Sequence, residues 1–124
     1  MRTVLAIAVA GALGTVARYA VEGIVTERTT DAFPVGTLVV NISGAFVLGF
    51  FFTLLTDRLI VAAWLRSAVT IGFLGAYTTF STLTLETLRL AEDGAPLLAL
   101  LNGLGSLLVG FVAVYAGVVL ARTV

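Results

Sequence analysis

The chain has 124 residues, of which 60% are hydrophobic and only 11% are charged. A soluble domain usually carries about 25% charged residues, so the composition excludes an ordinary soluble domain and a disordered segment. Cysteine and histidine are absent, which excludes disulfide frameworks and Cys/His zinc sites, and seven arginines balance seven acidic residues, which leaves no basic surface for nucleic acid.

Four long apolar runs follow one another along the chain, at residues 4–25, 33–55, 61–90 and 95–121. Each reaches the roughly 20 residues that a helix needs to cross a bilayer. They are too long and too uniformly apolar for the strands of a membrane β-barrel, which have about 10 alternating residues. We therefore predict an all-α integral membrane protein with four transmembrane helices in one domain, residues 1–124, in the cell membrane.

The first run contains a cationic side chain. Its start resembles a signal peptide, because Arg2 precedes an apolar stretch and Ala8-Val9-Ala10. The apolar character continues beyond that point, so a membrane span is the favoured interpretation. Arg18, further along, either snorkels to the membrane interface or supplies positive potential at a pore mouth.

The second run carries an amide at its middle. Pro34 fits the first turn of a helix, where its missing N–H does no harm. Thr37 and Asn41 are four residues apart and share one helix face. Asn41 either bonds to a neighbouring helix or donates to an anion.

The third run is too long for a straight span. Thirty helical residues extend for about 45 Å, whereas the hydrocarbon core is about 30 Å thick. Five of the seven residues 78–84 carry hydroxyls, and Gly72 and Gly75 lie just before them. This pattern favours a helix broken near residues 75–79, whose freed backbone groups must face protein, water or an ion. The alternative is an intact, tilted helix whose hydroxyls bond to the preceding turn.

The fourth run places Asn102 and Ser106 on one face, as a helix–helix hydrogen bond or as a polar lining. Aspartate, glutamate and lysine are absent from the middle of every run, and Glu22 and Glu86 lie near run ends. Hydroxyls, an amide and aromatic rings suit a passive path for a small ion better than a proton-driven pump. The sequence contains no nucleophile–base pair or phosphate loop, so we do not expect an enzyme.

The arginines give a weak orientation signal. Four belong to one predicted end of the bundle and two to the other: Arg2, Arg58, Arg66 and Arg122 against Arg28 and Arg89. The chain therefore inserts either in one orientation or in both.

Three stretches resemble the signature motifs of the Fluc/CrcB fluoride channels: residues 11–19 (GALGTVARY), 36–46 (GTLVVNISGAF) and 72–82 (GFLGAYTTFST). Chain length and segment number also match, so the resemblance covers essentially the whole chain. It implies a passive, selective channel that exports fluoride from the cytoplasm and relieves its toxicity. It also implies an antiparallel dimer, made of two copies of one chain or of two related chains, with the third helix broken at its middle.

The resemblance also implies roles for individual residues. By motif match, the fluoride pathway would include Arg18, Thr37, Asn41, Phe80, Ser81, Thr82 and, on the fourth helix, Ser106. A sodium ion at the dimer centre would be held by the backbone carbonyls of Gly75 and Thr78, and Glu86 matches an acidic position after the third motif. The positive edge of a phenylalanine ring can face an anion.

This chain departs from the family pattern at one position. The family carries a second phenylalanine three residues after the one that matches Phe80, whereas this chain has Leu83. Either one phenylalanine per chain suffices, or a related partner chain supplies the second ring, or transport is slowed or lost. Two other functions stay open: a subunit that transports nothing by itself, and a small multidrug-type exporter, which would need a central glutamate where the first span has Arg18.

Overall fold

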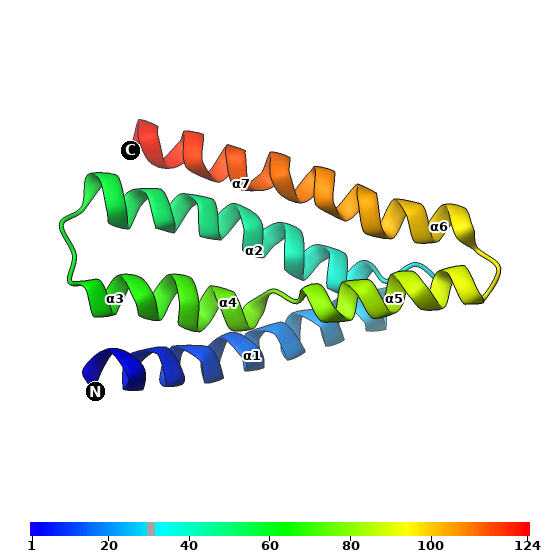
Figure 1. The fold of residues 1–124 in the computed structure, drawn as a ribbon, viewed down its shortest axis with the longest axis horizontal. Coiled ribbons are helices and arrows are strands. Elements are labelled where there is room, and N and C mark those ends of the chain that lie inside the picture. Colours follow the sequence, from blue (N-terminus) through cyan, green and yellow to red (C-terminus); the bar gives the residue numbers. More distant parts are fainter. Residues whose placement is uncertain (30–31) are drawn as a thin grey trace.

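The computed structural model describes residues 1–29 and 32–124. Four helical spans are long and apolar enough to cross a membrane: Arg2–Arg28, Val35–Arg58, Ala63–Glu92 and Pro96–Thr123. They run side by side along the long axis of the molecule, with both termini at one end (Figure 1). The predicted all-α fold with four spans is confirmed.

The first two spans are continuous helices. Helix α1 (Arg2–Arg28) forms the first span, and α2 (Val35–Thr53) continues into the π-helical turn η1 (Leu54–Arg58) to form the second. The prediction that Pro34 lies in the first helical turn is wrong. Pro34 is the N-cap, with a non-helical ψ of 70°, and its carbonyl accepts the first helical bond from the N–H of Leu38 at 3.2 Å.

The third span is interrupted at its middle. It comprises α3 (Ala63–Ser67), the π-helical η2 (Ala68–Phe73), α4 (Leu74–Tyr77) and α5 (Phe80–Glu92). Between α4 and α5, the backbone is extended, with ψ 157° at Thr78 and φ −147° at Thr79. The predicted break is therefore confirmed, and the strand-like link is visible in Figure 1.

The fourth span follows a tight turn. Gly94 has φ +77°, a left-handed conformation that favours glycine. Pro96 then opens α6 (Pro96–Leu100), and the helix continues through the π-helical η3 (Leu101–Gly105) into α7 (Ser106–Thr123).

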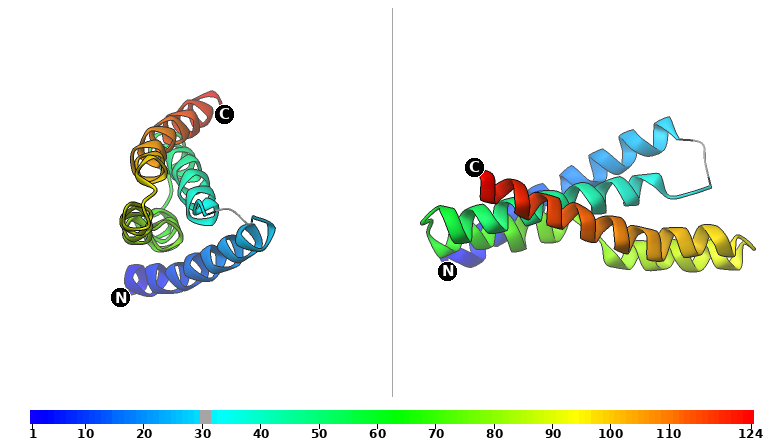
Figure 2. Two further views of the ribbon diagram at one scale, coloured as in Figure 1. Left: turned by 90° about the vertical axis from the view of Figure 1, so that its right-hand side faces the viewer. Right: turned by 90° about the horizontal axis from the view of Figure 1, so that it is seen from above.

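Small residues let the spans approach closely. A Cβ at Gly49 of α2 would collide with the carbonyl of Val114, and one at Gly117 of α7 would collide with the carbonyl of Phe46. Their backbones are therefore almost in contact, as the small residues of these helices predict. Helices α7 and α1 lie at opposite edges of the bundle, with α2 and the third span between them (Figure 2).

The arginines are divided between the two ends as predicted. The end with both termini carries Arg2, Arg58, Arg66 and Arg122, on α1, η1, α3 and α7. There the Arg2 guanidinium lies 4.3 Å from the ring centroid of Trp64, so a cation–π contact ties the start of α1 to α3.

Candidate functional site

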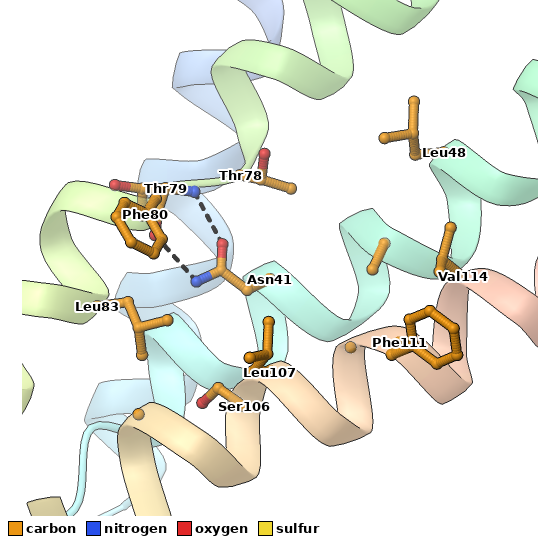
Figure 3. Close-up of a pocket in the computed structure, with 13 residues that line it drawn as sticks. Asn41, Leu48, Thr78, Thr79, Phe80, Leu83, Ser106, Leu107, Phe111 and Val114 are labelled. Atoms are coloured by element: carbon orange, nitrogen blue, oxygen red, sulfur yellow. Dashed lines mark hydrogen bonds between the residues drawn. The ribbon is translucent and has the colours of Figure 1, made fainter.

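The side-chain amide of Asn41 forms hydrogen bonds with both backbone polar groups of Thr79, which lies in the break. Asn41 Nδ2 donates to the carbonyl of Thr79 at 3.0 Å, and the N–H of Thr79 donates to Asn41 Oδ1 at 2.8 Å. Figure 3 shows this reciprocal pair as two dashed lines between α2 and the link. The second hydrogen of Nδ2 is left for another acceptor, because a primary amide carries two.

The hydroxyl of Thr79 starts the next helix. Its Oγ1 accepts from the N–H of Thr82 at 3.2 Å, so Thr79 is the N-cap of α5. The same oxygen donates to Thr82 Oγ1 at 3.0 Å and lies 3.4 Å from Ser81 Oγ. Thr79 thus joins two predicted pathway residues, although the sequence analysis did not place Thr79 itself in the site.

Because the N–H groups of Thr79 and Thr82 bond to side chains, two backbone carbonyls of the third span lack the donors that they would have in a helix. In an unbroken helix, the N–H of Thr79 would bond to the carbonyl of Gly75, and the N–H of Thr82 to that of Thr78. Both N–H groups instead donate to side chains, Asn41 and Thr79. Gly75 is also exposed on the single chain. The predicted sodium ligands are therefore free to accept from, or coordinate, another group.

Helix α2 packs closely against the break in the third span. A Cβ at Gly44 would collide with the Thr78 side chain, so only glycine permits this approach. Beside it, Ser43 Oγ and Tyr77 Oη are 2.9 Å apart and share a hydrogen bond. The break is thus fixed on both of its sides by α2.

A first cavity of about 400 Å³ opens beside the break, between α2, α5 and the fourth span. Asn41, Phe80 and Leu83 line one side of it, and Ser106 lines the other (Figure 3). Phe80 is 77% exposed on the single chain. Ser106 Oγ is buried and has no hydrogen-bond partner.

A second, smaller cavity of about 140 Å³ is lined by two of the predicted hydroxyls. It is lined by Thr37 and Thr82 together with Glu22, Thr26 and Glu86. Thr37 Oγ1 donates to Glu86 Oε1 at 2.7 Å, while Glu86 Oε2 and Glu22 Oε1 are buried without a partner. The hydroxyl pair Thr79–Thr82 lies between the two cavities, because Thr79 lines the first and Thr82 the second.

The predicted pathway residues are therefore brought together in two groups, with two exceptions. Arg18 is half-buried on α1, Ser81 is exposed at the start of α5, and neither residue lines a cavity. Sequence reasoning missed Glu22 and Thr26, which face the second cavity from α1. Their four-residue spacing places them on one helix face, but nothing in the sequence shows that this face meets the start of α2.

Comparisons with known proteins agree along almost the whole chain. The family model described as "CrcB-like protein, Camphor Resistance (CrcB)" matches residues 5–118. A protein of Magnetococcus marinus named "Fluoride-specific ion channel FluC" is 48% identical over 118 residues, which cover 95% of this chain and 96% of that protein. A protein of the same name from Geobacter sulfurreducens is 47% identical over 122 residues, 98% of each chain.

The reciprocal pair gives a stability prediction. Replacing Asn41 with leucine leaves the N–H and carbonyl of Thr79 unpaired, which we expect to lower the free energy of unfolding by about 2–6 kcal/mol. Asn41→Asp keeps the acceptor for the N–H of Thr79 and loses the donor to its carbonyl, so we expect it also to be less stable than the wild-type protein. Thermal unfolding of the purified protein in detergent measures the change.

The matched control is Thr84→Ala, which removes an exposed hydroxyl that bonds only to the Ser81 carbonyl and is expected to change stability by less than about 0.5 kcal/mol. An Asn41→Leu protein as stable as this control would show that the break does not depend on the amide.

Proposed function

This chain belongs to the CrcB/FluC family of membrane proteins, and from that premise we propose that it lets fluoride leave the cytoplasm passively through a selective pathway. It is a fluoride-specific ion channel and not an enzyme. The observation that carries the proposal is the broken third helix, where hydroxyls of the break and the Asn41 amide of α2 line two neighbouring cavities. Membership of this family argues against the alternative function of a small multidrug-type exporter.

Fluoride is small and strongly hydrated, so a narrow path must replace its water with closely placed donors. In the first cavity, the free hydrogen of Asn41 Nδ2 can donate to fluoride, and the positive ring edge of Phe80 can also contact the anion. The hydroxyl of Thr82 continues the donors toward the second cavity, and Ser106 adds one from the fourth helix. Thr37 lines the second cavity with its proton donated to Glu86, and the exposed hydroxyl of Ser81 lies 3.4 Å from Thr79 Oγ1. Arg18 acts from α1 through its positive potential.

The working unit we propose is an antiparallel dimer of two copies of this chain, or of this chain and a related one. The strongly exposed Phe80 and the donor-free carbonyl of Gly75 support it, because a second subunit can cover both. A two-fold axis at the break would bring the same groups from each chain to one point.

The break also fits a sodium ion at that axis. Carbonyls of unwound helices and helix C-terminal ends are the groups that coordinate Na⁺ in membrane proteins. Gly75 and Thr78 supply such carbonyls at the end of α4, and the ion would add positive potential near the anion path. These two residues of each chain would hold the ion.

Fluoride efflux from liposomes that contain the purified homodimer tests the channel. We expect a fluoride electrode to record rapid efflux, with chloride retained. Phe80→Ile and Asn41→Asp each remove a group that meets the ion and should slow efflux by about tenfold or more, which corresponds to about 1.4 kcal/mol of barrier.

The matched control is Phe52→Ile, which makes the same substitution at an exposed phenylalanine outside both cavities and should leave efflux unchanged. A folded wild-type dimer that passes no fluoride contradicts the proposal for the homodimer. If Leu83→Phe then restores efflux, the missing second ring is the cause; if only a related chain restores it, the channel is a heterodimer.

Single cysteines test the antiparallel arrangement, since the chain has none of its own. Ala62 and Asp93 are exposed at opposite ends of the bundle. In intact cells, an impermeant maleimide should label about half of the Ala62→Cys chains and about half of the Asp93→Cys chains, because a two-fold axis in the membrane plane presents both ends outside. Full labelling of one variant and none of the other would mean one fixed orientation.

Replacing sodium tests the ion site. We expect the dimer to unfold at a lower temperature after prolonged dialysis into choline chloride, and sodium chloride to restore the original midpoint, because an ion bound only to the folded dimer stabilises it. Equal midpoints in both salts would remove sodium from the proposal.

A further inference from the structure

The fourth span contains a fully buried polar side chain that the fluoride pathway does not use. Asn102 lies in the π-helical turn η3 and is 0% exposed. Its neighbour Gly103 packs against Thr87 of α5, since a Cβ there would lie 3.4 Å from Thr87 Cγ2. Asn102 is therefore held where the fourth span contacts α5, and π-helical turns are frequent at functional sites.

Two hydrogen bonds in series tie Asn102 to the wall of the first cavity. Asn102 Nδ2 donates to Thr87 Oγ1 at 3.0 Å, and Thr87 Oγ1 donates to the carbonyl of Leu83 at 2.8 Å. Leu83 lines the first cavity one turn after Phe80. Because the one hydroxyl proton of Thr87 goes to Leu83, Thr87 can only accept from the amide, and this fixes Oδ1 on the other side.

Two buried side-chain atoms of the fourth span have no partner among residues 1–29 and 32–124. Asn102 Oδ1 and Ser106 Oγ are both enclosed within the single chain, and Ser106 is only 6% exposed. Leaving such groups unpaired in the interior is unfavourable. The two residues are one helical turn apart, about 5–6 Å between Cβ atoms, which suits one bridging molecule that donates to Oδ1 and bonds to the hydroxyl.

We propose that Asn102 Oδ1 and Ser106 Oγ hold one buried water molecule, and that Asn102 is a positioning residue for α5. Water fits because Oδ1 only accepts, a serine hydroxyl both donates and accepts, and buried waters typically make about 3 hydrogen bonds to such groups. The water and Thr87 together fix α5 against the fourth span, and α5 carries Phe80 and Leu83 into the cavity. The effect on ion flow rests on the proposed channel function, whereas the water site does not.

A high-resolution map of the wild-type protein tests the water site directly. We expect a peak within hydrogen-bond distance of both Asn102 Oδ1 and Ser106 Oγ. A direct bond between the two side chains, or a protein donor to Oδ1, would overturn this half of the proposal. The map decides it even if the wild-type protein passes no fluoride, an outcome that would contradict the channel assignment instead.

Substitutions at Thr87 and Asn102 test the positioning role in liposomes, with efflux calculated per folded dimer. Thr87→Val removes the hydroxyl link while keeping the shape, and Asn102→Leu removes the link and the water. Each should lower fluoride efflux by up to about tenfold, the equivalent of one lost hydrogen bond in the barrier, and lower the fluoride-to-chloride ratio. Thr87→Ser keeps the hydroxyl and should retain both values.

These readouts separate positioning from simple stability. A purely structural role would reduce the amount of folded dimer and leave efflux per dimer and the ion ratio unchanged. Because both residues act through one chain of bonds, the double variant should be no slower than the slower single variant. Wild-type efflux and selectivity in folded Thr87→Val dimers would overturn the positioning role, even if Asn102→Leu fails to fold.

Discussion

The reciprocal bond pair between Asn41 and Thr79 is the interaction on which the rest of the structure depends. In a bilayer, no water is present to satisfy a backbone group that leaves its helix, and each unsatisfied group costs several kcal/mol. The break exposes both the N–H and the carbonyl of Thr79. A primary amide carries a donor and an acceptor side by side, so one side chain of α2 satisfies both at 3.0 and 2.8 Å. A carboxylate or an apolar group at this position cannot do both.

The geometry of the site follows from this pair. With Thr79 held in extended conformation, its hydroxyl is free to cap α5, and α5 then starts at Phe80. The same diversion of N–H groups removes the helical donors of the Gly75 and Thr78 carbonyls. One tertiary bond pair therefore sets the direction of the phenylalanine, the line of hydroxyls and the two carbonyl acceptors.

Local patterns in the sequence predicted the helices and the break, and tertiary pairing decided the rest. Run length and hydroxyl density placed the break near residues 75–79, and the structure has it at Thr78–Thr79. The partner of Asn41 lies 38 residues away, and that of Thr37, Glu86, lies 49 residues away, so only the packing of α2 against α5 identifies them. The predicted and observed positions of Pro34 at the start of the helix differ by one residue, because proline is compatible with both the N-cap and the first turn. Arg18 lies in the first of the three stretches that resemble the channel family's motifs, yet its position on α1 leaves it outside both cavities.

The break also gives a physical reason for the proposed second subunit. Contact with lipid is favourable for an exposed apolar side chain, so most of the exposed surface of the four spans requires no protein partner. Gly75 differs, because it is exposed and its carbonyl has lost its helical donor at membrane depth. Such an acceptor cannot face hydrocarbon without cost and must meet protein, water or a cation. In the proposed dimer, an inverted second copy would place the same carbonyls opposite these, and a cation between them would satisfy the acceptors of both chains. In that arrangement, the polar cost of opening the third helix would favour association of the two subunits.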